Sequence, residues 1–327
     1  MTGLRRRDIM IGGALAMAGA APAGAQGAWP TKQPIRWVVP YTAGGFTDLS
    51  TRIPLAHVAD ALGQSVVVDN KPGANSIIGA EIVAKAPPDG YTMLTVIAAH
   101  AANATLYKGR LPFDAVKSFT PISLVTIAPL ILTVANALPV KSVPELIAYA
   151  KANPGKVSFG SSGVGAAAHL TSELMKQVCG IEMTHVPYKG TAPALADLVA
   201  GNLHMLIDSP SGVMAQVRAG KIRALAMLSK ERVPGADEVP TIVENGGPPI
   251  ESSSWAMYLA PAGTPKDIVE RLSAETAKAL KRPDVAKRLV ELGVLAAGYD
   301  PAASAAFLDA EIAKWGKVIT AADVKIE

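Results

Sequence analysis

Residues 35–52 read IRWVVPYTAGGFTDLSTR, an apolar run followed by a Gly-Gly pair and an amphipathic segment. The pattern predicts a strand, a loop and the N-terminus of a helix. Gly44 and Gly45 carry no Cβ, so the backbone there can adopt positive φ and approach a bound group closely. The first N–H groups of the following helix have no partner inside the helix, and they favour an anion. We therefore expect this corner to hold a small carboxylate without catalysing a reaction on it.

A second corner of the same kind lies at residues 157–170, VSFGSSGVGAAAHL. Ser161 and Ser162 offer hydroxyls, while Gly163 and Gly165 permit close approach of the backbone before the next helix begins. A Gly-rich turn after a strand is common and mostly structural. Two such corners in different halves of the chain indicate a binding site between two lobes.

Strand and helix patterns alternate outward from both corners, which predicts an α/β fold with mainly parallel sheets flanked by helices. Long β-type runs at residues 119–135 and 251–260 are expected to cross between the lobes. The first lobe should then be discontinuous, comprising residues 27–128 plus 254–327, and the second lobe should comprise residues 129–253. Pro54 removes one helical hydrogen bond, so we expect a kink or a late start of the helix there.

The first 25 residues are typical of an export signal peptide, with Arg5 to Arg7, an apolar segment and then Ala-Gly-Ala. The arginines fit either a twin-arginine or an ordinary Sec signal. No later stretch has the roughly 20 consecutive apolar residues of a membrane helix, so we expect a soluble periplasmic protein. The formal net charge of +4 is too small to indicate nucleic-acid binding. Separately, we expect the protein to be a monomer.

Few residues suggest redox or metal chemistry. Cys179 is the only cysteine, which excludes an intrachain disulfide, and its apolar surroundings predict a buried, inert thiol. His169 and Glu173 share a helix face, but the other histidines are scattered and supply no second pair of metal ligands. We therefore expect neither a metal nor a cofactor.

Two enzymatic alternatives involve the second corner. Gly163 to Ala168 matches the G-x-G-x-x-A pattern of dinucleotide-binding loops, and Glu182 follows at a suitable distance, although before the next strand rather than at its end. A dinucleotide-dependent oxidoreductase therefore remains an alternative. Residues 160–164, GSSGV, lack the second glycine of the G-x-S-x-G motif, which disfavours a serine hydrolase.

Several long stretches resemble one known family. They are residues 37–52, 66–94 (VVVDNKPGANSIIGAEIVAKAPPDGYTML), 152–175, 184–208 (THVPYKGTAPALADLVAGNLHMLID), 220–227, 239–246 and 253–272. Over nearly all of its expected mature length the chain is similar to the periplasmic solute-binding proteins of tripartite tricarboxylate transporters, the Bug or TctC family. This resemblance implies a two-lobed, type II-like periplasmic-binding fold that closes on a carboxylate and delivers it to a membrane permease. A periplasmic sensor for a signalling receptor would use the same site.

The resemblance also implies which residues contact the ligand. The two Gly-rich loops supply Tyr41, Ala43, Gly44, Gly45, Thr47 and Asp48 on one side and Ser161, Ser162, Gly163 and Gly165 on the other. A second group of expected contacts comprises His100, Asn103, Tyr188, Lys189, Gly190, Ala192 and Asp208. No catalytic residue is implied.

The chain departs from the family pattern at Thr42-Ala43, at Phe46, at Pro54 and at His204. The larger side chain of Phe46 should narrow or reshape the mouth of the site. Asp48 would repel an anion, unless it caps the helix, orients the loop or meets an amine or hydroxyl of the ligand. We expect Phe46 and Asp48 to influence most strongly which acid is held.

Overall fold

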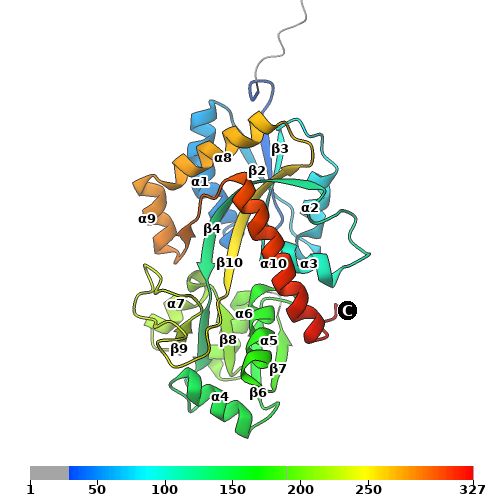
Figure 1. Ribbon diagram of the computed structural model, residues 1–327. Coiled ribbons are helices and arrows are strands. Elements are labelled where there is room, and N and C mark those ends of the chain that lie inside the picture. The colour runs from blue at the N-terminus through cyan, green and yellow to red at the C-terminus, as the bar shows by residue number, and fades with distance from the viewer. Residues whose placement is uncertain (1–28, 189, 327) are drawn as a thin grey trace, which may run out of the picture.

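The computed structural model describes residues 29–188 and 190–326, so the expected signal peptide at residues 1–25 and the expected contact Lys189 lie outside the described residues. The described chain forms two α/β lobes, which lie one above the other in Figure 1. The two-lobed α/β prediction is thus confirmed. The residues at which each lobe begins and ends remain a prediction.

The upper lobe in Figure 1 is built on a sheet with the order β11-β4-β10-β3-β1-β2. Its strands are β1 (Ile35–Val39), β2 (Val66–Asn70), β3 (Thr92–Ile97), β4 (Phe119–Pro129), β10 (Ser253–Pro261) and β11 (Leu295–Ala296). The lower sheet has the order β7-β6-β8-β5-β9. Its strands are β5 (Ile131–Ala135), β6 (Val157–Ser161), β7 (Met183–Pro187), β8 (Met205–Asp208) and β9 (Ile222–Met227).

Both sheets are mixed rather than mainly parallel, which corrects the prediction from the alternating pattern. Strands β1, β2 and β3 pair in parallel, as do β6, β7 and β8. The strands next to the crossings run the other way: β10 pairs antiparallel with β3 and β4, and β5 pairs antiparallel with β8 and β9. A chain that enters a lobe along a crossing strand, without a βαβ connection, reaches its neighbour in this antiparallel sense.

The crossings lie side by side. Leu130, between β4 and β5, donates its N–H to the carbonyl of Ser252 (3.0 Å), and Leu228 donates to the carbonyl of Leu130 (2.8 Å). The register between β4 and β10 shifts beside Pro121, and proline supplies no N–H to the ladder. Paired backbone at the crossings fixes where the two lobes join.

Helices cover both sheets. They are α1 (Phe46–Leu62), α2 (Ile77–Ala84), α3 (Ala98–Leu106), α4 (Val143–Ala152), α5 (Ala167–Cys179), α6 (Thr191–Ala200), α7 (Pro210–Arg218), α8 (Lys266–Leu280), α9 (Pro283–Glu291) and α10 (Pro301–Ala321), with a 3-10 turn at Ala74–Ser76. The sequence patterns predicted most of these helices, but not α3, which follows β3 directly. Helix α10 packs against α3 and β4 and also reaches α5 of the lower lobe (Figure 1).

Helix α1 begins at Phe46, so the late start expected at Pro54 is wrong. Proline at this position cannot donate to the carbonyl of Ser50. The hydroxyl of Tyr258 approaches that carbonyl at 3.4 Å and donates to the carbonyl of Thr51 at 3.0 Å. A buried tyrosine from the far end of the chain therefore compensates for the missing helical bond.

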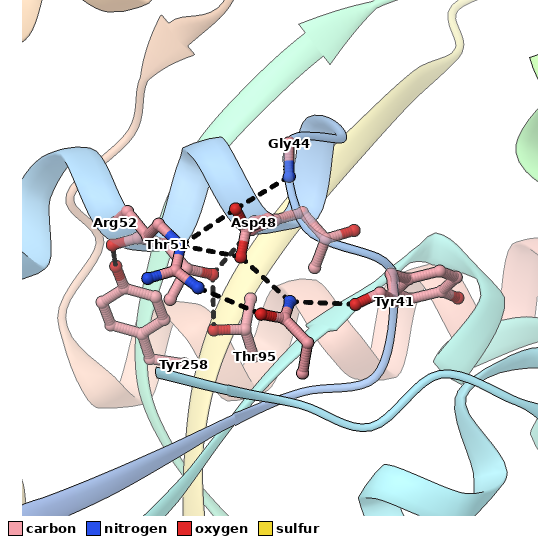
Figure 2. A network of polar contacts seen from close by, with 9 residues as sticks. Tyr41, Gly44, Asp48, Thr51, Arg52, Thr95 and Tyr258 are labelled. Atoms are coloured by element: carbon pink, nitrogen blue, oxygen red, sulfur yellow. Dashed lines mark hydrogen bonds and ion pairs between the residues drawn. The ribbon is translucent and has the colours of Figure 1, made fainter. Parts of the chain in front are cut away.

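A buried polar chain continues from this point beneath α1 (Figure 2). Thr51 Oγ1 donates to the carbonyl of Thr47 (2.6 Å) and lies 2.9 Å from Thr95 Oγ1, which accepts from Trp37 Nε1 (2.9 Å). The rings of Trp37 and Tyr258 meet edge to face with centroids 4.6 Å apart. All four side chains are fully buried, so this network ties α1 to the centre of the upper sheet.

We predict that Thr95→Val costs about 1–3 kcal/mol of unfolding free energy, because it leaves the Trp37 N–H buried without an acceptor. Thr126→Val is the matched control: Thr126 is equally buried on β4, and its hydroxyl has no hydrogen-bond partner within the described residues. That change should be nearly neutral. Urea unfolding of both variants decides the matter, and equal losses would contradict the role given to Thr95.

Candidate functional site

A cavity of about 520 Å³ lies between the two lobes. Its lining comes from loops and first helical turns of both lobes, together with the crossing region. The described lining residues are Tyr41, Thr42, Gly44, Gly45, Phe46, Thr47, Leu49, Asn75, Ile97, Ala98, Ala99, Leu130, Ser162, Gly163, Ala166, Ala167, Ala168, Gly190, Thr191, Asp208, Ser209, Ser211, Gly212, Ser254 and Leu292. Most of these positions present backbone or small side chains.

The first turns of α1, α3, α5, α6 and α7 all line this cavity. Within the described residues, none of these five helices has a side chain that caps its N-terminus by a hydrogen bond. Of the helices that begin elsewhere, α4 and α10 are capped by Ser142 and Asp300, whereas α2, α8 and α9 have no side-chain cap either. The uncapped N–H groups and the positive ends of the helix dipoles therefore remain available to a bound anion.

No Lys, Arg or His side chain is among the described residues that line the cavity. Tyr41 contributes a buried hydroxyl that makes no hydrogen bond within the described part of the chain. Burial raises the pKa of this phenol, so it stays protonated and can donate. The described lining of the cavity thus offers donors without a formal positive charge.

The side chain of Asp48 holds the Gly44 loop of the first corner in place (Figure 2). Its carboxylate accepts from the Gly44 N–H (2.9 Å), from Arg52 Nε (2.9 Å) and from Asn70 Nδ2 (2.9 Å). Burial by itself would raise the pKa of Asp48, but these donors together hold it below its ordinary value. Asp48 therefore faces away from the cavity and orients the loop, one of the roles considered from the sequence.

The second corner rests on two stacked histidines. The rings of His169 and His185 lie 3.8 Å apart, and the Phe159 ring stacks on His185 at 5.0 Å. His169 Nδ1 accepts the N–H of Gly165 (3.1 Å), and His185 Nε2 lies 2.7 Å from the hydroxyl of Ser161, which also donates to the carbonyl of Gly163. These contacts fix the Gly163–Gly165 loop at the edge of the cavity.

Both histidines are neutral near pH 7. Burial lowers the pKa of His169 to about 3, with the charges of His185 and Lys176 acting in the same direction. Burial likewise lowers the pKa of His185 to about 4, and the Lys176 charge adds to this effect. A neutral His169 is required, because only an unprotonated Nδ1 can accept the N–H of Gly165.

The structure brings together eight of the expected contacts at the cavity: Tyr41, Gly44, Gly45, Thr47, Ser162, Gly163, Gly190 and Asp208. Ala43, Asp48, His100, Asn103, Ser161, Gly165, Tyr188 and Ala192 are not among its lining residues. Their ligand contacts, drawn from the resemblance, therefore have no support from the position of these residues.

Three of these residues have other partners. His100 packs between Phe113 and Phe119 and contacts the carbonyl of Ala115 at 2.8 Å. Tyr188 donates its hydroxyl to Asp197. Asn103 and Asn75 exchange two hydrogen bonds of 2.8 and 2.9 Å.

Asn75 was missed by the sequence reasoning although it lines the cavity. Its backbone adopts a left-handed conformation (φ 50°, ψ 48°), which is strained for most residues but tolerated by asparagine. The paired bonds to Asn103 hold it there. Thr191 and Ser209 to Gly212 could have been found, because each follows directly where a strand is predicted to end. Leu292 also lines the cavity, but no sequence pattern marked it as a site residue.

Glycines allow the lobes to approach each other around the cavity. A Cβ on Gly165 would overlap Leu106 of α3, and a Cβ on Gly293 would overlap Pro210 of α7. Both contacts join the upper lobe to the lower lobe. The two lobes therefore touch each other at Gly165–Leu106 and at Gly293–Pro210.

The dinucleotide alternative is not supported by this geometry. Gly165 packs against Leu106 instead of facing an open pocket, and Glu182 stands before β7, away from the strand end where a ribose would be held.

Cys179 is partly exposed instead of fully buried, and burial still raises the pKa of its thiol.

Two searches of the described residues bear on other functions. They contain no cluster of three or more potential metal-binding side chains. Among the same residues, every helix is too short or too polar to span a bilayer.

Comparison with known proteins gives consistent matches. The family model of the tripartite tricarboxylate transporter family receptor matches residues 51–324. Protein BugT of Bordetella pertussis is 34% identical over 99% of this chain and 99% of its own length. The structure of R. palustris Rpa4515 with adipate superposes with a TM-score of 0.82 at 39% identity, covering 91% of this chain and 99% of that one. The structure of MatC from Rhodopseudomonas palustris with bound malate superposes with a TM-score of 0.77 at 32% identity, covering 88% of this chain and 99% of that one.

We predict that the free energy of unfolding falls as the pH drops below about 6.5. Unfolded histidines take up protons there, while His100, His169 and His185, with pKa values of about 4, 3 and 4, do not. Each contributes at most about 1.4 kcal/mol per pH unit. Urea unfolding between pH 7 and 5 measures the slope.

His169→Asn keeps an acceptor near the Nδ1 position but removes one titrating ring, so its slope should be shallower than that of the unmodified protein. Absolute stabilities do not matter for this comparison. An unchanged slope in the variant would contradict the neutral state assigned to His169.

Proposed function

Because the chain belongs to the tripartite tricarboxylate transporter receptor family, we propose that it captures a small carboxylate between its lobes and delivers it to the permease subunits of such a transporter. Membership confirms the resemblance to the Bug proteins and makes the chain a periplasmic solute-binding protein, not an enzyme. Export by a twin-arginine or a Sec signal and action as a monomer remain predictions.

The observation that carries the proposal is the ring of uncapped helix N-termini around a cavity whose described lining has no cation. Each terminus stabilises an anion by roughly 0.3–1 kcal/mol, or about 2 kcal/mol when partly buried. Each hydrogen bond to a charged group contributes roughly 1.5–3 kcal/mol. Four to six such bonds, less the cost of ordering, reach the roughly −8 kcal/mol of micromolar binding.

The solved relatives support a carboxylate as ligand. Rpa4515 was solved with adipate and MatC with malate, both of them small organic acids with two carboxyl groups. A cavity of about 520 Å³ is large enough for acids of this size. We propose a small organic acid as the ligand of this chain, held by the residues that line the cavity.

Closure of the lobes completes the proposed site. The ligand would favour the closed state because only there do α1 and α3 of one lobe face α5, α6 and α7 of the other. A sensor that passes its closed state to a signalling receptor would use the same cavity. Family membership favours transport, and recovery of permease subunits or of a receptor in a pull-down distinguishes the two roles.

Calorimetry of the mature protein against mono-, di- and tricarboxylates of three to six carbons tests the proposal. We predict a dissociation constant in the micromolar range for at least one acid. Binding of a dinucleotide, with none of the acids bound, would contradict the proposal.

A pair of loop variants tests the location of the ligand. Gly45 has φ −83°, and a Cβ there would make only an ordinary contact, 3.8 Å from the Thr42 carbonyl oxygen, so Gly45→Leu should fold normally while filling the cavity. We predict at least a roughly tenfold loss of affinity, a difference of about 1.4 kcal/mol. Ala43→Leu alters the same exposed loop beside the cavity lining and should change affinity far less. Equal effects would contradict this placement of the ligand.

A second pair of variants tests closure. We predict that Gly293→Ala weakens binding, since its Cβ would overlap Pro210 and hinder the closed state. Gly155→Ala is the control: Gly155 has a similar positive φ (72° against 65°), but nothing lies near its Cβ position. Both variants should lose similar stability in thermal melts. Equal affinity for the acid in both would contradict the role of the Gly293–Pro210 contact.

A further inference from the structure

Asp208 is the one Asp, Glu, Lys, Arg or His among the described residues that line the cavity. It ends β8 and lies between the first turns of α6 and α7. Its Oδ2 accepts from Thr191 Oγ1 (2.7 Å), and its Oδ1 accepts from the N–H (2.7 Å) and Oγ (3.2 Å) of Ser209. The protein has thus placed an anion of its own at this end of the cavity.

These bonds use donors that a ligand carboxylate would otherwise receive. The Thr191 and Ser209 hydroxyls both point to Asp208, and Gly212 brings α7 so close that an added Cβ would lie 3.0 Å from Asp208 Oδ1. The positive ends of α6 and α7 are therefore already matched by a negative charge. The first turns of α1, α3 and α5 add no carboxylate to the described lining.

We propose that Asp208 determines ligand selectivity: the ligand places its carboxylate on α1, α3 and α5 and presents a hydrogen-bond donor, such as a hydroxyl, carboxamide or ammonium group, to Asp208. The inference rests on the proposed function and narrows its substrate class. A carboxylate has about four lone-pair sites, and three on Asp208 are engaged within the protein. The fourth remains for a donor, whereas a second ligand carboxylate would meet a like charge.

The surroundings of Asp208 agree with this assignment. Burial raises the pKa of its carboxyl, although the bonds from Thr191 and Ser209 oppose the effect. The other titratable side chain of the described lining is Tyr41, which is protonated. No described cation at the cavity is therefore in place to offset a second negative charge beside Asp208.

A charge-swap cycle tests the proposal. Calorimetry at pH 7 compares the unmodified protein and Asp208→Asn with two matched pairs of acids: succinate against succinamate, and adipate against its monoamide. Each amide replaces one carboxylate by a donor of nearly the same size. The unmodified protein should bind the monoamide of at least one pair about tenfold more tightly than the diacid, and Asp208→Asn should abolish or reverse this preference.

Asp197→Asn is the control, because Asp197 bonds with Tyr188 and Asn202 and is not among the lining residues; it should keep the original preference. Tighter binding of the diacids by the unmodified protein would overturn the inference even if Asp208→Asn failed to fold. An equal preference in the unmodified protein and Asp208→Asn would overturn the inference and leave the proposed function standing. Failure of all four acids to bind would overturn the inference, whereas the proposed function is decided by the wider series of mono-, di- and tricarboxylates.

Discussion

The structure depends on the N–H groups of helix termini that the protein leaves uncapped. Parallel strands β1, β6 and β7 end at the cleft, and so do β3 and β8, which places the helix after each one with its first turn at the cavity. A buried N–H without a partner costs free energy, so such a site is favourable only when a ligand or water satisfies it. Binding of an anion at the cavity supplies the missing acceptor.

Several polar side chains hold the backbone that lines the cavity without lining the cavity themselves. Asp48 fixes the Gly44 loop, Asn103 holds Asn75 in a left-handed conformation, and neutral His169 accepts the N–H of Gly165. None of the three residues Asp48, Asn103 and His169 lines the cavity. Their common effect is to position backbone, and a rigid backbone loses less entropy when the ligand binds.

Much of the fold and part of the site were predictable from local sequence. Alternating patterns located most strands and helices, although not α3 or β11, and the two Gly-rich corners pointed to the cleft. The mixed sheets were not predictable, because strand direction depends on where the chain crosses between lobes. The orientation of Asp48 depends on Asn70 from the neighbouring strand, and the compensation of Pro54 depends on Tyr258. Ala98 and Ala99 contribute a helix terminus without any distinctive side chain, so no motif marks them.

The central claim is that backbone N–H groups, and not a cationic side chain, hold the ligand carboxylate. A crystal structure of the mature protein with its co-purified or added acid tests this claim most directly. It should place a carboxylate within about 3 Å of N–H groups in the first turns of α1, α3 or α5. A carboxylate paired with a lysine or arginine, or bound outside the interlobe cavity, would contradict the claim.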